Sequence, residues 1–242
     1  MMTEGKASDR SSEWFVPKFG PPKFRIMAGL LFLPYTAMVL SFTAIGSMLA
    51  RHIYWDRVLS IMLIYFLGLG IAAHALDAVG SKERKPWGRV FTRRQLWSMA
   101  VASLVVAYAI AVYYMLRYVP WLSIVAVLEG FFVFAYNLEW FHGRFHTDGW
   151  FAFSWGFLPA LAGHVMQTNR ISPTAMVLAL SMGLLSIVEI KASRPYKAFK
   201  GRLHPLGEEE KRLMEGYEAI LKSISLGVVL LAVGLVVWRI FD

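Results

Sequence analysis

The chain has 242 residues, of which 57% are hydrophobic and 17% are charged, and its formal net charge is +9. It contains no cysteine, which excludes disulfides, thiolate catalysis and cysteine-based zinc or iron–sulfur sites. Basic loops beside a membrane account for the positive charge, so we expect no nucleic-acid partner.

Apolar runs of about 20 residues recur along the chain, and each is long enough to cross a roughly 30 Å hydrocarbon layer as a helix. Because lipid offers the backbone no hydrogen-bonding partners, these runs predict an all-α, polytopic transmembrane bundle. A cytoplasmic N-terminal arm, residues 1–25, is expected to precede a single membrane domain, residues 26–242. About seven spans are expected in that domain: Met27–Ala50, Arg57–Ala78, Leu96–Leu116, Val119–Leu138, Gly149–Gln167, Ser172–Ile190 and Ile220–Ile240.

Lysine and arginine divide unequally between the two ends of these spans. Twenty of the 25 fall on the side of the N-terminal arm and the three longer loops, and five fall on the other side. The positive-inside rule therefore predicts an integral membrane protein with a cytoplasmic N-terminus and an outside C-terminus. The arm lacks the short apolar core of a cleavable signal peptide, so we expect it to stay in the cytoplasm.

The last cytoplasmic loop is expected to run from Lys191 to Ala219. Its later part, Gly207–Glu218, places glutamates and basic residues around Leu213, Met214 and Tyr217. This pattern predicts an amphipathic helix that lies on the membrane surface before the last span.

The stretch YNLEWFHGRFHTD, Tyr136–Asp148, is a polar and aromatic interruption between two apolar runs. His142 and His146 have the i,i+4 spacing with which two imidazoles on a helix share a metal, and Asp148 offers a third ligand. Gly143 is expected to break the helix there, and no HExxH motif is present. A zinc or iron site at these residues is therefore kept as an alternative only.

Ionisable side chains within the spans are further candidates, because a charge at the centre of a membrane helix costs about 2.5–3.5 kcal/mol. Glu129 lies in the middle of the fourth span, where we expect it to be protonated or paired, in a structural or a functional role. His74 and Asp77 lie three residues apart on one helical face at the inner end of the second span. Glu189 lies at the inner end of the sixth span.

A basic, proline-containing segment follows each of the two acids Asp77 and Glu189. Two carboxylates with nearby cations suit a Mg²⁺ ion bound together with a phosphate or diphosphate. Positive-inside charge beside helix-end carboxylates is the plainer alternative. The cations are Lys82, Arg84 and Lys85 after the first acid, and Lys191 and Arg194 after the second.

Three segments of the chain resemble the UbiA superfamily of intramembrane prenyltransferases. AHALDAVGSKERKPWGR (Ala73–Arg89) stands where that family carries its first Asp-rich motif, and IVEIKASRP (Ile187–Pro195) stands where it carries the second. Tyr136–Gln167 resembles the family's tyrosine-containing fourth span, loop and fifth span. Asp77 matches one aspartate of the first motif, Glu189 replaces one of the second, and Tyr136 fits the family's tyrosine.

This resemblance implies transfer of a prenyl group from an isoprenoid diphosphate to a lipid or aromatic acceptor, with Mg²⁺ as cofactor. Asp77 and Glu189 would act in catalysis and hold the metal, with Asp148 as a further ligand. The chain departs from the family in its number of spans and of motif acids. The alternative is a non-catalytic bundle that binds an isoprenoid or quinone lipid or joins other membrane proteins. The residues expected to bind substrate are His74, Lys82, Arg84, Lys85, Tyr136, Asn137, Arg144, Lys191 and Arg194.

Overall fold

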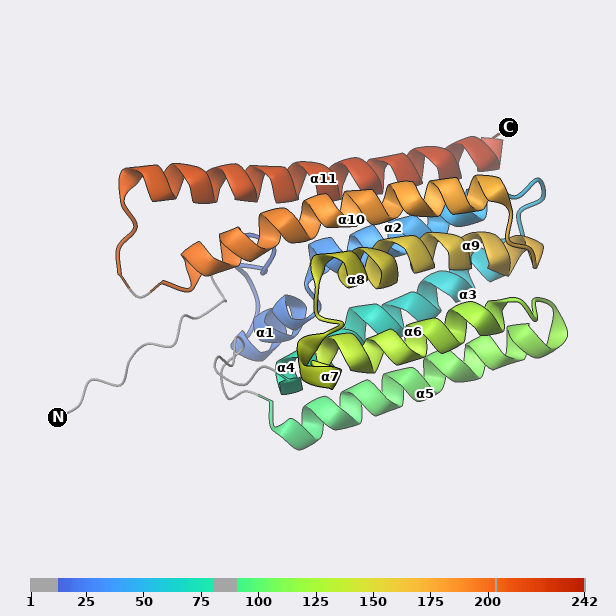
Figure 1. Ribbon diagram of the computed structural model, residues 1–242, viewed down its shortest axis with the longest axis horizontal. Helices are drawn as coiled ribbons and strands as arrows, with labels where there is room; N and C mark the ends of the chain where they lie inside the picture. The colour runs from blue at the N-terminus through green and yellow to red at the C-terminus, as the bar shows by residue number, and fades with distance from the viewer. Residues whose placement is uncertain (1–12, 81–90, 203, 242) are drawn as a thin grey trace.

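The computed structural model describes residues 13–80, 91–202 and 204–241, and within these ranges every regular element is helical. Figure 1 shows long helices running side by side along one axis, as the apolar runs predict. The elements are α1 (Pro22–Leu30), α2 (Leu33–Met48), α3 (Trp55–Tyr65), η2 (Phe66–Ala73), α4 (His74–Gly80), α5 (Arg93–Arg117), α6 (Leu122–Asn137), α7 (Trp140–Gly143), α8 (Asp148–Ala152), η3 (Phe153–Phe157), α9 (Leu158–Thr168), α10 (Pro173–Lys200) and α11 (Glu208–Phe241).

Three of the expected spans are interrupted rather than regular helices. The first bends by 44° between α1 and α2, where Phe32 adopts a left-handed backbone conformation with φ of 42°. The second and the fifth each contain a π-helical stretch, η2 and η3, that continues without a break into the neighbouring α-helices. Such wide turns change the direction in which the following side chains point, and they are frequent at functional sites.

α2 forms the centre of the bundle and packs against α9, α11 and α3. Its contact with α9 is close because both helices present glycine. A Cβ atom at Gly46 would lie 1.9 Å from the Ala160 carbonyl oxygen, and one at Gly163 would lie 2.0 Å from that of Thr43. Small residues allow membrane helices to approach in this way. At the far end, the Arg239 guanidinium donates to the Met48 carbonyl and ties α11 to α2.

The chain after the sixth span differs from the sequence-based expectation. α10 continues past Ile190 to Lys200, with Pro195 inside it, so the expected loop shrinks to residues 201–207. The predicted surface helix is also wrong, because Gly207–Glu218 belongs largely to α11, which runs unbroken for 34 residues into the last span. A helix of that length measures about 51 Å, well beyond the thickness of the hydrocarbon layer.

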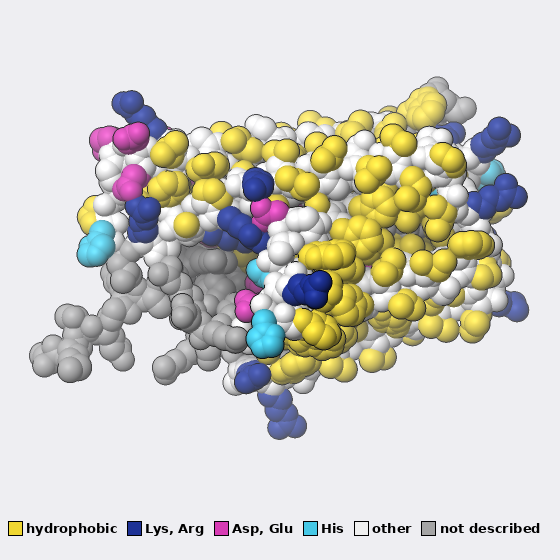
Figure 2. Space-filling view, in the orientation of Figure 1, with side chains coloured by type: hydrophobic (Ala, Val, Ile, Leu, Met, Phe, Trp, Pro, Cys, Tyr) yellow, Lys and Arg dark blue, Asp and Glu magenta, His cyan; other side chains and the backbone are white. Residues whose placement is uncertain are grey.

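Among the described residues, four helices are long and apolar enough to cross a membrane: the run α3–η2–α4, and α5, α10 and α11. The bent pair α1 and α2 makes a fifth. α6 is apolar but shorter. Figure 2 shows a broad hydrophobic surface over the right half of the visible face, with charged side chains at the two margins and in a group near the middle of the view. The described part of the chain is therefore all-helical, and its long apolar helices are those expected of a membrane protein.

The two ends of the bundle differ in character. One end, which we call the inner end, holds α4, α7 and the beginnings of α8 and α11 (Figure 1). The other, outer end holds the short turns that join α2 to α3, α5 to α6 and α9 to α10. The polar stretch Tyr136–Asp148 and the helix α4, which carries His74 and Asp77, lie at the inner end.

Candidate functional site

Three segments far apart in the sequence converge at the inner end: α4, the stretch from Tyr136 to Asp148, and the second half of α10. α4 approaches the end of α6 closely, since a Cβ atom at Gly80 would lie 2.4 Å from the Asn137 carbonyl oxygen. We call the polar residues brought together here the inner cluster: His74, Asp77, Tyr136, Asp148, Glu189, Lys191, Arg194 and Lys197.

Asp148 joins the beginning of α8 to α10. Thr147 caps α8, its side chain accepting a hydrogen bond from the Trp150 amide, which sets Asp148 in the first helical turn. One carboxylate oxygen of Asp148 lies 3.2 Å from Lys191 Nζ and the other 2.9 Å from an Arg194 nitrogen. Both cations are substantially exposed, so they also face the water at this end of the bundle.

Tyr136 connects Arg194 to α4. Its hydroxyl interacts electrostatically with Arg194, Asp77 and Asp148. Its ring stacks on that of His146 with centroids 4.4 Å apart, and His146 Nδ1 lies 3.0 Å from the Tyr136 carbonyl oxygen. The tyrosine is thereby fixed between the loop histidine and the polar residues of α4 and α10.

A second part of the inner cluster lies deeper and is enclosed by aromatic rings. His74 stacks on Phe32 with centroids 5.1 Å apart and lies 5.2 Å from the Trp155 ring. The Lys197 ammonium lies 4.6 Å from the Phe32 centroid and 5.0 Å from that of Tyr35. Lys197 also acts electrostatically on both His74 and Glu189.

The interrupted helices place these aromatic rings. Phe32 is the left-handed residue between α1 and α2, a conformation that is unfavourable for a bulky side chain. Trp155 lies within η3, and His74 follows η2 directly. The left-handed turn at Phe32 and η3 therefore lie at this site, and η2 ends beside it.

The deep part of the site also contains buried polar atoms whose bonding capacity is unused. Glu189 is 2% exposed, and its Oε1 makes no hydrogen bond within the described residues. His74 Nε2 and Ser186 Oγ are likewise buried and unbonded within those ranges. Native structures rarely leave such groups unsatisfied, so they point to a polar ligand.

Glu129 lies apart from the inner cluster. Its Oε1 accepts a hydrogen bond of 2.8 Å from the Tyr65 hydroxyl, which joins the end of α3 to α6. The sequence predicts a protonated or paired acid here, and the pairing is confirmed.

Several predicted site residues take no part in the convergence. Asn137 donates to the Val133 carbonyl of its own helix, and Arg144 is exposed. The helical geometry that His142 and His146 need for a shared metal is absent, because α7 ends at Gly143 and His142 has a left-handed backbone. Lys82, Arg84 and Lys85 lie outside the described residues.

The site contains residues that the sequence analysis did not select, namely Phe32, Tyr35, Trp155 and Lys197. Aromatic residues make up 15% of the chain, so a single ring carries no signal by itself. Lys197 could have been recognised from the sequence, because it follows Glu189 and Ser193 at intervals of four residues and so lies on the same helical face. The expectation that α10 ends at Ile190 hid that pattern.

In the comparisons with known proteins, the chain matches no family model, no curated protein and no solved structure.

Proposed function

We propose that this protein is a UbiA-like membrane prenyltransferase that binds an isoprenoid diphosphate at the inner cluster. The observation that carries the proposal is the arrangement of His74, Glu189 and Lys197 among aromatic rings, directly beside the exposed cations Lys191 and Arg194. A diphosphate head would lie toward these cations, and the isoprenoid chain would lie toward the rings.

The cations suit the diphosphate. An arginine binds two phosphate oxygens at once, and a lysine supplies a compact charge to a third. In the structure Asp148 forms ion pairs with both Lys191 and Arg194. A diphosphate would compete with Asp148 for them, and the basic segment after α4 would add further positive charge.

The aromatic rings suit the chemistry at the first carbon of the isoprenoid. When the bond between this carbon and the diphosphate oxygen breaks, the electron pair leaves with the diphosphate and an allylic cation remains. Aromatic faces stabilise a nearby cation, as Phe32 and Tyr35 do for the Lys197 ammonium. The acceptor then bonds to the first carbon and gives up a proton.

A single Mg²⁺ ion fits this donor set better than a pair of ions does. Within the described ranges no three His, Asp or Glu side chains come together as a metal site. Mg²⁺ is commonly held by one or two carboxylates, with substrate phosphates and waters completing six oxygen ligands. Asp77 and Glu189 would hold one ion in this way, and its charge would assist departure of the diphosphate.

We also propose seven spans, with the inner end in the cytoplasm, the N-terminus inside and the C-terminus outside. The unequal distribution of lysine and arginine supports this orientation. The isoprenoid would enter from the surrounding lipid.

A second function is favoured by the small number of acids. A bundle that only binds an isoprenoid or quinone lipid, alone or with other membrane proteins, needs no metal. In such a protein the ion pairs of Asp148 with Lys191 and Arg194 would persist, and no diphosphate would be released.

The test uses the protein in lipid nanodiscs with isotope-labelled geranylgeranyl diphosphate, with and without Mg²⁺. We expect metal-dependent diphosphate release, detected together with the prenylated product or the alcohol formed by water. Asp77→Asn and Glu189→Gln should each lower the rate at least about 100-fold, as loss of electrostatic stabilisation does elsewhere. Glu139→Gln, which changes an exposed acid at the same end, is the matched control.

Three outcomes separate the alternatives. Wild-type rates from both acid variants would remove the proposed catalytic roles. Tight binding of the diphosphate without its release under any condition would establish the binding function instead. Failure to bind the diphosphate, with a quinone or other lipid found by mass spectrometry of the purified protein, would reject the diphosphate site.

A further inference from the structure

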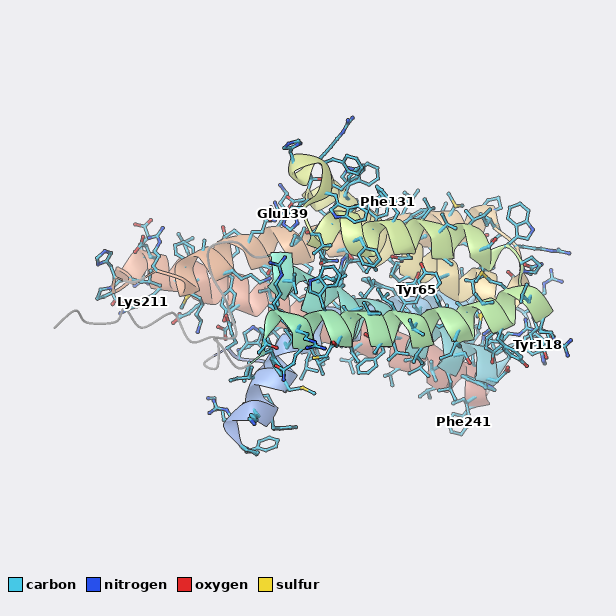
Figure 3. The ribbon with its side chains drawn as sticks, turned by 90° about the horizontal axis from the view of Figure 1, so that it is seen from below. Tyr65, Tyr118, Phe131, Glu139, Lys211 and Phe241 are labelled. Carbon is cyan, nitrogen blue, oxygen red and sulfur yellow. The ribbon has the colours of Figure 1, made fainter. Side chains whose placement is uncertain are left out.

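A cavity within the membrane-embedded part of the bundle takes no part in the proposed site. It lies among α3, η2, α5 and α6 and has an internal volume of about 60 Å³. This is several times the roughly 10–15 Å³ that a water molecule needs. Figure 3 shows Tyr65, one of its lining residues, in the space between α5 and α6.

Small residues keep this cavity open. A Cβ atom at Gly68 would meet no atom within 4 Å, so the space beside this residue is empty. Gly130 makes room for the Tyr108 hydroxyl, which would lie 2.1 Å from a Cβ atom there and donates to the Ala126 carbonyl. Alanines at positions 107, 111, 126 and 162 continue the same lining.

Glu129 is the only ionisable acid in the lining, and only one of its two carboxyl oxygens has a hydrogen-bond partner within the described residues. Glu129 Oε1 accepts the hydrogen bond of Tyr65, whereas Glu129 Oε2 is buried and makes no hydrogen bond within the described residues. In lipid, where no water can bond to it, an unsatisfied polar atom is strongly unfavourable. The remainder of the lining, apart from Tyr65 and Tyr108, is aliphatic or glycine.

The cavity is accessible from the lipid side. Tyr108 is 37% exposed, and Ile64, Gly68 and Gly130 are partly exposed on helices that lie in the hydrophobic surface. A molecule dissolved in the bilayer would therefore reach Glu129 without passing through the inner end.

We propose that this cavity binds a long-chain or isoprenoid alcohol, with the hydroxyl group on Glu129 Oε2. A hydroxyl both donates and accepts a hydrogen bond, so it satisfies the carboxyl group in either protonation state. A ketone oxygen only accepts, and a charged head group would be placed in hydrocarbon. The aliphatic lining matches an alkyl or isoprenoid chain and offers few ring faces for an aromatic ligand.

The experiment is photo-cross-linking in nanodiscs with a long-chain alcohol that carries a diazirine near its hydroxyl. We expect labelled peptides to contain Gly68 and Glu129. Farnesol should compete about tenfold better than farnesene, a hydrocarbon with the same carbon skeleton and no hydroxyl, because one hydrogen bond to a carboxyl group is gained. Equal competition by the two compounds would overturn the proposal and leave a cavity for water or unspecific lipid.

Two variants separate the carboxyl group from the space beside it. Glu129→Leu should abolish the preference for farnesol over farnesene as competitor, and Gly68→Leu should fill the cavity and suppress labelling by the diazirine probe. Gly234→Leu is the matched control, because Gly234 also meets no neighbour within 4 Å but lies on α11, away from the cavity. Gly68→Leu keeps Glu129 intact, so its labelling by the probe tests whether the ligand occupies this cavity even where Glu129→Leu fails to fold. Wild-type labelling in Gly68→Leu would refute the assignment.

This proposal is independent of prenyl transfer. The probe has no diphosphate, and no lining residue of the cavity belongs to the inner cluster. Loss of prenyl transfer in Asp77→Asn would leave alcohol binding unchanged.

Discussion

Lys197 places a positive charge in the aromatic part of the inner cluster. Its ammonium group lies over Phe32 and near Tyr35, and it acts electrostatically on His74 and Glu189. Lys200 lies one helical turn further and contacts the Tyr196 ring instead, at 5.9 Å. The two lysines therefore differ in surroundings but share a helix.

We expect Lys197→Met to weaken binding of geranylgeranyl diphosphate at least about tenfold, because a partly desolvated positive charge next to the cations that bind the diphosphate is lost. Lys200→Met should change the affinity less than about twofold. Both affinities can be measured by titration in nanodiscs. Equal effects of the two variants would show that only the general positive charge of this end matters.

At the scale of single residues, the sequence could identify the acidic residues of the inner cluster but not the aromatic rings beside them. Asp77 and Glu189 stand out because charged groups are rare within apolar runs, and the fold brings the helices that carry them to the same end. Phe32 and Trp155 could not be selected, because their place depends on the left-handed turn and on η3. Neither irregularity follows from hydrophobic periodicity, which assumes a regular helix.

Among the helices, the contact between α2 and α9 depends most directly on single residues. Gly163 and Gly46 allow the two backbones to touch, and neither site has room for a methyl group. Gly227 on α11 meets no neighbour within 4 Å, which makes it a suitable comparison.

Gly163→Ala should lower the free energy of unfolding by about 1–3 kcal/mol, because the backbones must separate to admit the added carbon. Gly227→Ala should be neutral or slightly stabilising, since alanine is the better helix former. Thermal or SDS unfolding in detergent gives both values. A tolerated Gly163→Ala would mean that the two helices are further apart than described.

α11 is the element for which sequence reasoning failed most clearly. The amphipathic pattern of Gly207–Glu218 is typical of a surface helix, but it fits equally well a helix that leaves the membrane. Contacts decide between them: Tyr217 stacks with Phe199 of α10, and Leu221 packs against Tyr196. These contacts hold the first part of α11 along α10.

The unbroken course of α11 predicts the distance between two spin labels placed along it. Spin labels on Glu209→Cys and Leu230→Cys should be separated by about 32 Å along a straight helix. A right-angled bend after Glu218 would shorten this to about 22 Å. Double electron–electron resonance can distinguish the two values, and the absence of native cysteine removes any background labelling.

For the whole molecule, the sequence predicted the helical class and the positions of most helices, because span length is set by the bilayer. It could not predict how the helices pack, since lipid and core are equally apolar and hydrophobicity does not distinguish the two faces. The convergence of α4, α8 and α10 therefore becomes visible only in the structure.

Orientation in the membrane can be tested with the same cysteine-free background. Gly207→Cys lies in the inner turn between α10 and α11, and Arg170→Cys in the outer turn between α9 and α10. A membrane-impermeant maleimide should label Arg170→Cys on intact cells, and Gly207→Cys only after lysis. The reverse result would invert the proposed topology.

The pairing of α2 with α11 has a consequence for biogenesis. The Arg239 guanidinium and the Met48 carbonyl that it contacts are 191 residues apart. At about 5–20 residues per second, a ribosome needs some ten to forty seconds to complete that interval. Throughout this time the α2 surface that later meets α11 is without its partner, and the nascent protein depends on lipid or the insertion machinery to shield it.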